Sequence, residues 1–193
     1  MKASSRSEEE GAELLARLGY AVGGAGYPRG LTPAQWAALR YLSRANRFSR
    51  TVSAFAEFHA TTRGTASQTV QRLVDRGFVR KNPSPVDGRS IRLDLTKKGR
   101  EILGVDPLND LVAAFGSLPP AARARFVRTL KDLVARLAHV RGGRSFGTCP
   151  ACLHFDGDAH CRTDPAECWC NLFAQPLDVA ETDELCVNYQ PAG

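Results

Sequence analysis

Six cysteines carry the most distinctive chemistry in this chain of 193 residues, and all of them lie within residues 149–193. Clustered thiols can form disulfides, bind zinc or hold an iron–sulfur cluster. A segment of this length buries little apolar surface, so it needs a metal or covalent cross-links to fold. The six positions are Cys149, Cys152, Cys161, Cys168, Cys170 and Cys186.

Three interpretations of these cysteines compete. An even number of cysteines is typical of disulfides. No apolar signal segment opens the chain, however, so we expect the protein to lie in the cytoplasm. The cytoplasm is reducing and disfavours disulfides. Zinc suits Cys149 and Cys152, whose two-residue spacing directs two thiolates at one ion, and His154 and His160 are further candidate ligands. No second pair repeats that spacing, whereas an iron–sulfur cluster accepts four thiolates at uneven spacing. We favour the cluster.

A second set of chemically suited residues lies on a helix predicted to begin at Thr62 and to end before Gly77. One face is apolar, as a helix packed on a core requires. The opposite face carries hydrogen-bond donors and acceptors that match base edges in the major groove of double-stranded DNA. These DNA-binding candidates are Thr62, Arg63, Ser67, Gln68, Gln71 and Arg72.

The charge of the chain divides in the same place as its cysteines. Residues 1–148 hold 25 Lys and Arg against 12 Asp and Glu, a balance of +13. Residues 149–193 hold one basic residue against eight acidic ones, a balance of −7. A strongly basic body is typical of nucleic-acid binding, and an acidic tail is not. We expect the tail to rest on the basic body and not to touch DNA.

The elements that position these residues follow from the apolar periodicity and the turn residues. Helices are predicted where apolar residues recur every three or four positions, and two strands where they alternate. The expected helices cover about 8–22, 33–42, 52–58, 62–76, 97–115 with a bend near Gly104 and Pro107, and 119–140; the expected strands cover 78–81 and 91–95. Their order is that of a winged helix-turn-helix, in which the hairpin tip holds Arg89 against the minor groove.

The fold class is therefore mainly α with a small β-hairpin, joined to a small metal-stabilised C-terminal module. The helix at 119–140 carries an apolar stripe from Phe126 to Leu137 that is longer than the small winged domain can bury. We expect this stripe to pack against a second copy of the chain. The predicted units are a DNA-binding and dimerisation domain over 1–140, a linker over 141–147 and a cysteine-rich module over 148–193.

Four segments resemble the MarR-type transcriptional regulators. They are 31–36 (LTPAQW), 77–81 (GFVRK), 87–90 (DGRS) and 95–100 (LTKKGR), and the similarity extends over about 8–140. The resemblance implies a homodimer with interlocked first and last helices, bound to a pseudo-palindromic operator. It also implies that Asp87 orients the wing and that Arg89 enters the minor groove. The turn at 58–61 (FHAT) lacks the leucine and glycine usual in that family.

The tail resembles the cluster-binding part of high-potential iron–sulfur proteins, over about 40 residues. That resemblance implies a 4Fe–4S cluster held by Cys149, Cys152, Cys170 and Cys186. It leaves Cys161 and Cys168 as extra thiols, one of which replaces a ligand or pairs with the other. The residues that it implies as a shield around the cluster are Phe155, Trp169, Leu172, Phe173 and Tyr189.

Together these features predict a cytoplasmic, homodimeric transcriptional repressor whose cluster senses redox state, oxygen or iron. Two alternatives stay open: a regulator with a structural zinc and a small-molecule signal, and a redox or electron-transfer protein. No nucleophile–base pair, phosphate-binding glycine loop or H-E-x-x-H pattern points to an enzyme. No apolar stretch is long enough to span a membrane.

Overall fold

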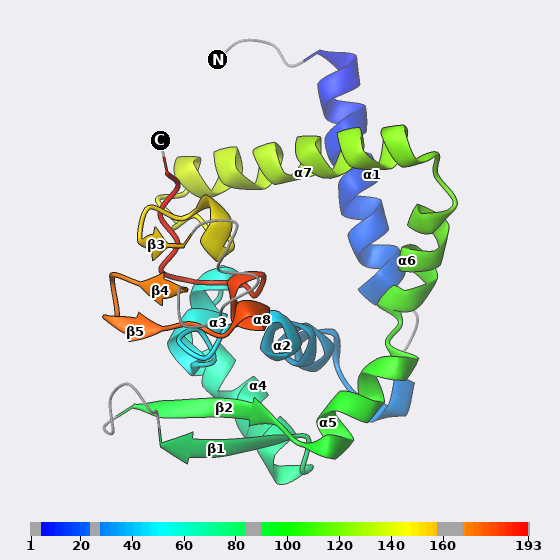
Figure 1. The fold of residues 1–193 in the computed structure, drawn as a ribbon. Coiled ribbons are helices and arrows are strands. Elements are labelled where there is room, and N and C mark those ends of the chain that lie inside the picture. The colour runs from blue at the N-terminus through cyan, green and yellow to red at the C-terminus, as the bar shows by residue number, and fades with distance from the viewer. Residues whose placement is uncertain (1–4, 24–27, 84–89, 158–167, 193) are drawn as a thin grey trace.

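The computed structural model describes residues 5–23, 28–83, 90–157 and 168–192 (Figure 1). They form a winged-helix head, a set of three helices that we call the helical arms, and a C-terminal module that rests on the head. None of the helices in these ranges combines the length and the apolar character needed to cross a membrane.

The head is formed by three helices and one hairpin. Helix α2 (Pro33–Arg44) begins where predicted, because the Thr32 side chain accepts a hydrogen bond from the Gln35 amide while the Gln35 side chain accepts one from the Thr32 amide. Helix α3 (Val52–Phe58) and helix α4 (Arg63–Asp75) are also capped by threonines, Thr51 and Thr62. Between α3 and α4, Ala60 adopts a φ of +48°, in the left-handed region that glycine favours.

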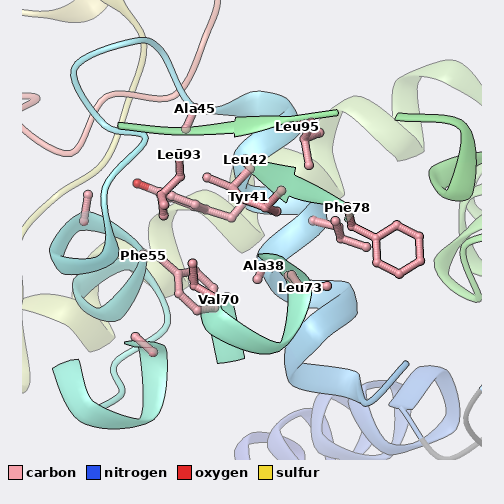
Figure 2. Packing of buried hydrophobic residues seen from close by; sticks show 14 of the residues in the cluster. Ala38, Tyr41, Leu42, Ala45, Phe55, Val70, Leu73, Phe78, Leu93 and Leu95 are labelled. Carbon is pink, nitrogen blue, oxygen red and sulfur yellow. The ribbon is translucent and has the colours of Figure 1, made fainter. Parts of the chain in front are cut away.

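The core of the head lies where α2, α3 and α4 meet the second strand of the hairpin (Figure 2). Its largest fully buried side chains include Leu39, Leu73 and Leu93, one from each of α2, α4 and the hairpin. Burial of such side chains contributes about 1.5–3 kcal/mol each. The apolar face predicted for the helix after Thr62 is therefore confirmed as the face that holds α4 in place.

The hairpin pairs β1 (Val79–Pro83) with β2 (Ile91–Leu95) in an antiparallel register that sets Val79 opposite Leu95. Thr96 then caps the short helix α5 (Lys97–Glu101). A Cβ atom on Gly99 would collide with the carbonyl oxygen of Phe78, so only glycine lets α5 pass this close to the residue that precedes β1.

The helical arms stand out from the head (Figure 1). They comprise α1 (Arg6–Gly23), α6 (Leu108–Gly116) and α7 (Pro120–Val140). The single bent helix expected over 97–115 is wrong: α5 is followed by a 3₁₀ turn (Ile102–Val105) and then by α6. Pro107 lacks an amide hydrogen, and the Asp106 carboxylate accepts the Leu108 amide at 2.8 Å, which starts a new helix.

The C-terminal module contains elements too short to predict from periodicity. The strands β3 (Phe155–Asp156), β4 (Trp169–Cys170) and β5 (Gln175–Pro176) form a small antiparallel sheet, and helix α8 (Val179–Thr182) follows. A 3₁₀ turn, Cys149–Ala151, opens the module.

The module packs on the loop between α2 and α3. The Asn46 amide donates to the Leu185 carbonyl at 3.0 Å, and the Leu185 amide donates to the Arg44 carbonyl at 2.7 Å. Val187 is buried in the core of the head itself. The expectation that the acidic tail rests on the basic body is confirmed, because Arg47 pairs with Glu181 at 2.8 Å.

Candidate functional sites

The outer face of α4 presents all six predicted DNA-binding residues to solvent. Within the described ranges Arg63 and Arg72 form no ion pair, so both guanidinium groups are available to bases or phosphates. The Thr62 hydroxyl accepts the Thr65 amide at 3.1 Å, so this side chain shapes the start of the helix.

The side chain of Gln71 binds two neighbouring side chains. Its amide nitrogen donates to Asp75 at 2.7 Å, and its amide oxygen accepts from Lys81 at 2.7 Å. The second of these bonds ties α4 to β1. Gln71 would have to release one of these partners to contact a base, so in this arrangement it sets the wing against the recognition helix.

The wing tip includes Asp87 and Arg89, and both lie outside the described residues. The strands on either side of it are held by Asp94, which accepts hydrogen bonds from Asn82 at 2.6 Å and from Arg92 at 3.0 Å. Burial by itself would raise the pKa of the Asp94 carboxyl, but these two hydrogen bonds and the charges of Arg92 and Arg50 lower it. The base of the wing is therefore fixed by an ionised, almost fully buried carboxylate.

The structure brings the four predicted ligand cysteines to one cavity. The space between the lining side chains, open solvent included, is about 350 Å³. Almost all of the remaining wall is apolar, apart from His154 and two asparagines. The lining comprises Cys149, Cys152, Cys170 and Cys186 together with Asn46, Phe48, His154, Phe155, Leu172, Phe173, Leu177 and Asn188.

The thiols influence one another across this cavity. The pKa of Cys149 is raised to about 12, first by burial and then by the charges of Cys186, Cys170 and Cys152, in that order. Burial likewise raises the pKa of Cys186, against hydrogen bonds from Asn188, Asn46 and Ser49 that lower it. Four thiolates in so apolar a site repel one another and require a positive partner.

Three further observations bear on what the cavity holds. The Nε2 atom of His154 is buried and has no hydrogen-bond partner in the described part of the structure. Phe155, Leu172 and Phe173 line the cavity as predicted, whereas Trp169 and Tyr189 do not. Tyr189 instead covers Gly147, where a Cβ atom would come within 2.7 Å of its ring. Among the described residues no group of three or more Cys, His, Asp or Glu is arranged to hold a single metal ion.

Cys168 is one of the two extra thiols for which we expect either a bond to the other or a ligand role. It is fully buried in the module and is disulfide-bonded. Cys161 lies outside the described residues. The expectation that disulfides are disfavoured is wrong for Cys168, and the even cysteine count was the signal of such a bond.

Sequence reasoning missed the contribution of the head to this cavity. Asn46 and Phe48 lie in the α2–α3 loop, more than 100 positions from Cys149 in the sequence. The phenyl ring of Phe48 stacks on that of Phe173 with centroids 4.1 Å apart. No spacing pattern connects such distant residues, so only the folded chain reveals them.

A second cavity lies between the head and the arms. Trp36 is buried at its edge, and its indole nitrogen has no hydrogen-bond partner among the described residues. Arg40 lines the same cavity and pairs with Asp106 at 2.8 Å. The other lining residues are Leu18, Gly19, Val22, Pro33, Pro107, Leu108 and Leu111.

Comparison with known proteins agrees with the fold. Residues 29–90 match the model of the MarR family. A MarR transcriptional regulator from Methanosarcina mazei Go1 superposes with a TM-score of 0.57 and 21% identity, covering 70% of this chain and 99% of that one. CouR from Rhodococcus jostii RHA1, bound to p-coumaroyl-CoA, gives a TM-score of 0.53 and 24% identity over 68% and 95% of the two chains.

Bordetella bronchiseptica BpsR, whose DNA binding is regulated by 6-hydroxynicotinic acid, gives a TM-score of 0.50 and 23% identity over 68% and 97%. No curated protein matches the chain in sequence. Each of these solved structures is covered almost completely, while nearly a third of this chain has no counterpart in it. Residues 29–90 are therefore similar to the MarR family of transcriptional regulators, within a fold that the chain shares with these solved structures.

Proposed function

We propose that the protein is a transcriptional regulator, acting as a repressor, that binds double-stranded DNA through α4 and the wing. The support is the free outer face of α4 in a MarR-type head of basic charge. Arg63 and Arg72 suit guanine edges or phosphates, and Gln68 suits adenine. Many basic residues near phosphates make such binding steeply dependent on salt.

The proposed active form is a homodimer on a pseudo-palindromic operator. Apolar side chains of α1 and α7 are exposed in the single chain, including Leu14 at 53%, Leu133 at 46% and Leu137 at 51%. An exposed apolar stripe on two long helices is typical of a surface that a partner covers. A second copy supplies the matching stripe by symmetry and presents a second recognition helix to the next turn of DNA.

We further propose that Cys149, Cys152, Cys170 and Cys186 hold an iron–sulfur cluster of the 4Fe–4S type. The observation that carries this proposal is the single apolar cavity that the four thiols share. Each thiolate of such a cluster binds its own iron, so the ligands surround a space instead of converging on one point. When bound, the cluster would supply an electron-accepting group that responds to redox state, oxygen or iron.

The residues of the chain fit that group in three respects. The four thiolates lose their mutual repulsion when they bind iron. Phe48, Phe155 and Phe173 exclude water from the space, and hydrogen bonds from Asn46 and Ser49 stabilise negative charge on the Cys186 sulfur. The buried Nε2 atom of His154 would gain a partner.

Anaerobic purification of the full chain tests this proposal. We expect brown protein with about four irons and four sulfides per chain, as a cubane of this type contains. Colourless protein that carries zinc would instead support the structural-zinc alternative. Protein that carries iron but selects no sequence from a pool of random duplexes would support the electron-transfer alternative.

A small-molecule signal is a second candidate function, and the cavity between the head and the arms favours it. The buried indole N–H of Trp36 has no acceptor among the described residues, and the cavity that Trp36 lines is mostly apolar. An aromatic acid or a thioester would satisfy that donor with its carbonyl group. CouR and BpsR show that proteins with this fold are found with such compounds.

A further inference from the structure

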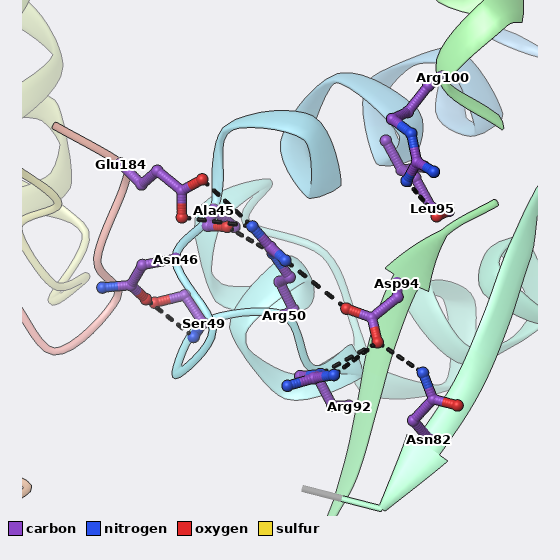
Figure 3. Close-up of polar contacts among 10 residues, drawn as sticks. All are labelled: Ala45, Asn46, Ser49, Arg50, Asn82, Arg92, Asp94, Leu95, Arg100 and Glu184. Carbon is purple, nitrogen blue, oxygen red and sulfur yellow. Dashed lines mark hydrogen bonds and ion pairs between the residues drawn. The ribbon is translucent and has the colours of Figure 1, made fainter. Parts of the chain in front are cut away.

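Arg50, in the loop between α2 and α3, contacts three parts of the molecule at once (Figure 3). Its Nε atom donates to the Ala45 carbonyl at 2.7 Å. One terminal nitrogen donates to both carboxylate oxygens of Glu184, in the module, at 3.2 and 3.3 Å. The other lies 3.6 Å from a carboxylate oxygen of Asp94, in the wing. Arg50 therefore contacts its own loop, the module and the wing.

On the wing side, this contact reaches both strands. The Arg50 carbonyl accepts the Leu93 amide at 2.7 Å, so the backbone of the loop is bonded to β2 as well. Asp94 in turn binds Asn82 of β1 and Arg92 of β2 (Figure 3). Asn82 lies near the end of β1, and Arg92 lies near the start of β2. A displacement of the Arg50 guanidinium would therefore shift Asp94 and, with it, the two strands of the wing that we propose binds DNA.

On the module side, the contact leads to a cysteine of the cavity. Glu184 lies two positions before Cys186, and the Cys186 sulfur is hydrogen-bonded by the side chains of Asn46 and Ser49. Both of these side chains are almost completely buried. The Ser49 hydroxyl oxygen also accepts the Val187 amide at 2.9 Å. The segments 46–50 and 184–187 are thus bonded repeatedly along their length.

We propose that Arg50 is a positioning residue that couples the content of the cysteine cavity to the wing. This inference rests on the proposed cluster and DNA-binding function and adds the route between them. Cys186 and Glu184 lie on one short segment, so a shift of Cys186 also shifts Glu184. The Glu184 carboxylate would displace the Arg50 guanidinium that it binds, and Arg50 would displace Asp94. The wing is the part adjusted, in each chain separately, so the coupling does not depend on the distance between two recognition helices.

Two similar ion pairs join the module to the loop between α2 and α3, and one of them serves as a control for the other. Glu181 binds Arg47 at 2.8 Å and joins the same module to the same loop, but Arg47 makes no ion pair with the wing within the described ranges. Glu184→Gln removes the carboxylate that faces Arg50. Glu181→Gln removes a comparable module–head ion pair and keeps a side chain suited to cap α8.

The experiment uses the full chain, purified anaerobically with its iron, and the same protein after its iron has been removed by a chelator. The DNA probe is a duplex selected from a random pool by the iron-bearing wild type. Fluorescence anisotropy gives the affinity of each form, and the ratio of the two is compared among variants. Coupling of this kind typically changes affinity by about 5–150-fold.

We expect the wild type and Glu181→Gln to show the same ratio, and Glu184→Gln to show a ratio close to one with an unchanged iron content. Asp94→Asn, which changes no residue of the module, should also bring the ratio of the two affinities close to one. Hydrogen exchange of the β1 and β2 amides should change on iron removal in the wild type but not in Glu184→Gln.

Two results would overturn the route through Arg50. The first is that Glu184→Gln and Asp94→Asn both keep the wild-type ratio of DNA affinities with and without iron. The second is that the wild type binds the duplex equally well before and after its iron is removed. Each of these leaves the cluster itself in place. A wild type that contains no iron would instead overturn the proposed cluster and, with it, the coupling.

Discussion

The ring of Phe48 lies parallel to the ring of Phe173, with an angle of 4° between their planes and 4.1 Å between their centroids. Phe48 comes from the winged-helix head, whereas Phe173 comes from the cysteine module. Because both line the cysteine cavity, one wall of that cavity belongs to the winged-helix head. The module is for this reason bound into the head and not a separate appendage.

Removal of this shared wall should loosen the module. We expect Phe48→Ala to destabilise it by about 1 kcal/mol through the lost ring pair alone, and by more through the opened cavity. The measurement is the thermal unfolding of the iron-bearing protein together with the rate at which the cluster bleaches in air. Leu153→Ala, at a side chain that is 62% exposed in the same module, serves as the control and should change neither.

The cysteines should separate into two groups when each is replaced by serine. Replacement of Cys149, Cys152, Cys170 or Cys186 should lower the iron content, because each thiolate would complete the coordination of the proposed cluster. Cys168→Ser should keep the iron but lower the thermal stability, since Cys168 is fully buried and disulfide-bonded. Iron and sulfide analysis of each variant makes the comparison; iron retained by Cys170→Ser and lost by Cys161→Ser would show that the ligand set is wrong.

Much of the head could be predicted from the sequence because its signals are local. Thr32 and Gln35 stand within one helical turn and cap α2 together, and the apolar face of α4 repeats at helical spacing. The break between α5 and α6 was predicted only as a bend, because the side chain of Asp106 competes with the backbone, which periodicity does not report. The docking of the module was foreseen only as a consequence of opposite charge. Its particular contacts join residues such as Arg50 and Glu184, for which a sequence gives no distance.

The close approach of α5 to the residue that precedes β1 depends on Gly99. In Gly99→Ala the new Cβ atom would meet the backbone oxygen of Phe78, which cannot rotate away, so the strand or the helix must shift. We expect a loss of about 1–3 kcal/mol, as for other overpacked sites, measured by urea unfolding. Gly104→Ala is the matched control, because a Cβ atom at Gly104 meets nothing within 4 Å.

Replacement of Arg63 should affect DNA binding, whereas replacement of Arg76 should affect stability. Arg63→Ala should weaken binding to the selected duplex by about 1–3 kcal/mol without loss of stability, since its side chain is exposed and forms no ion pair in the described ranges. Arg76→Ala should instead lower stability, because Arg76 donates to the carbonyls of Gly30 and Arg29 at 2.6 and 2.8 Å. Anisotropy and thermal unfolding of both variants distinguish the roles; equal affinity of Arg63→Ala and the wild type would remove this residue from the DNA contacts.

The exposed stripe on α7 provides the test of assembly. Leu133→Glu places a charge where the proposed partner chain would cover an apolar surface, and burial of an unpaired carboxylate there is costly. Since Leu133 is 46% exposed in the single chain, the fold of that chain should survive the change. Light scattering should report a dimer for the wild type and a monomer for Leu133→Glu, with unchanged circular dichroism. Glu in place of Arg128, an exposed residue of α7 outside the apolar stripe, is the control for added negative charge and should remain dimeric. A dimer that persists in Leu133→Glu would place the interface elsewhere on the molecule.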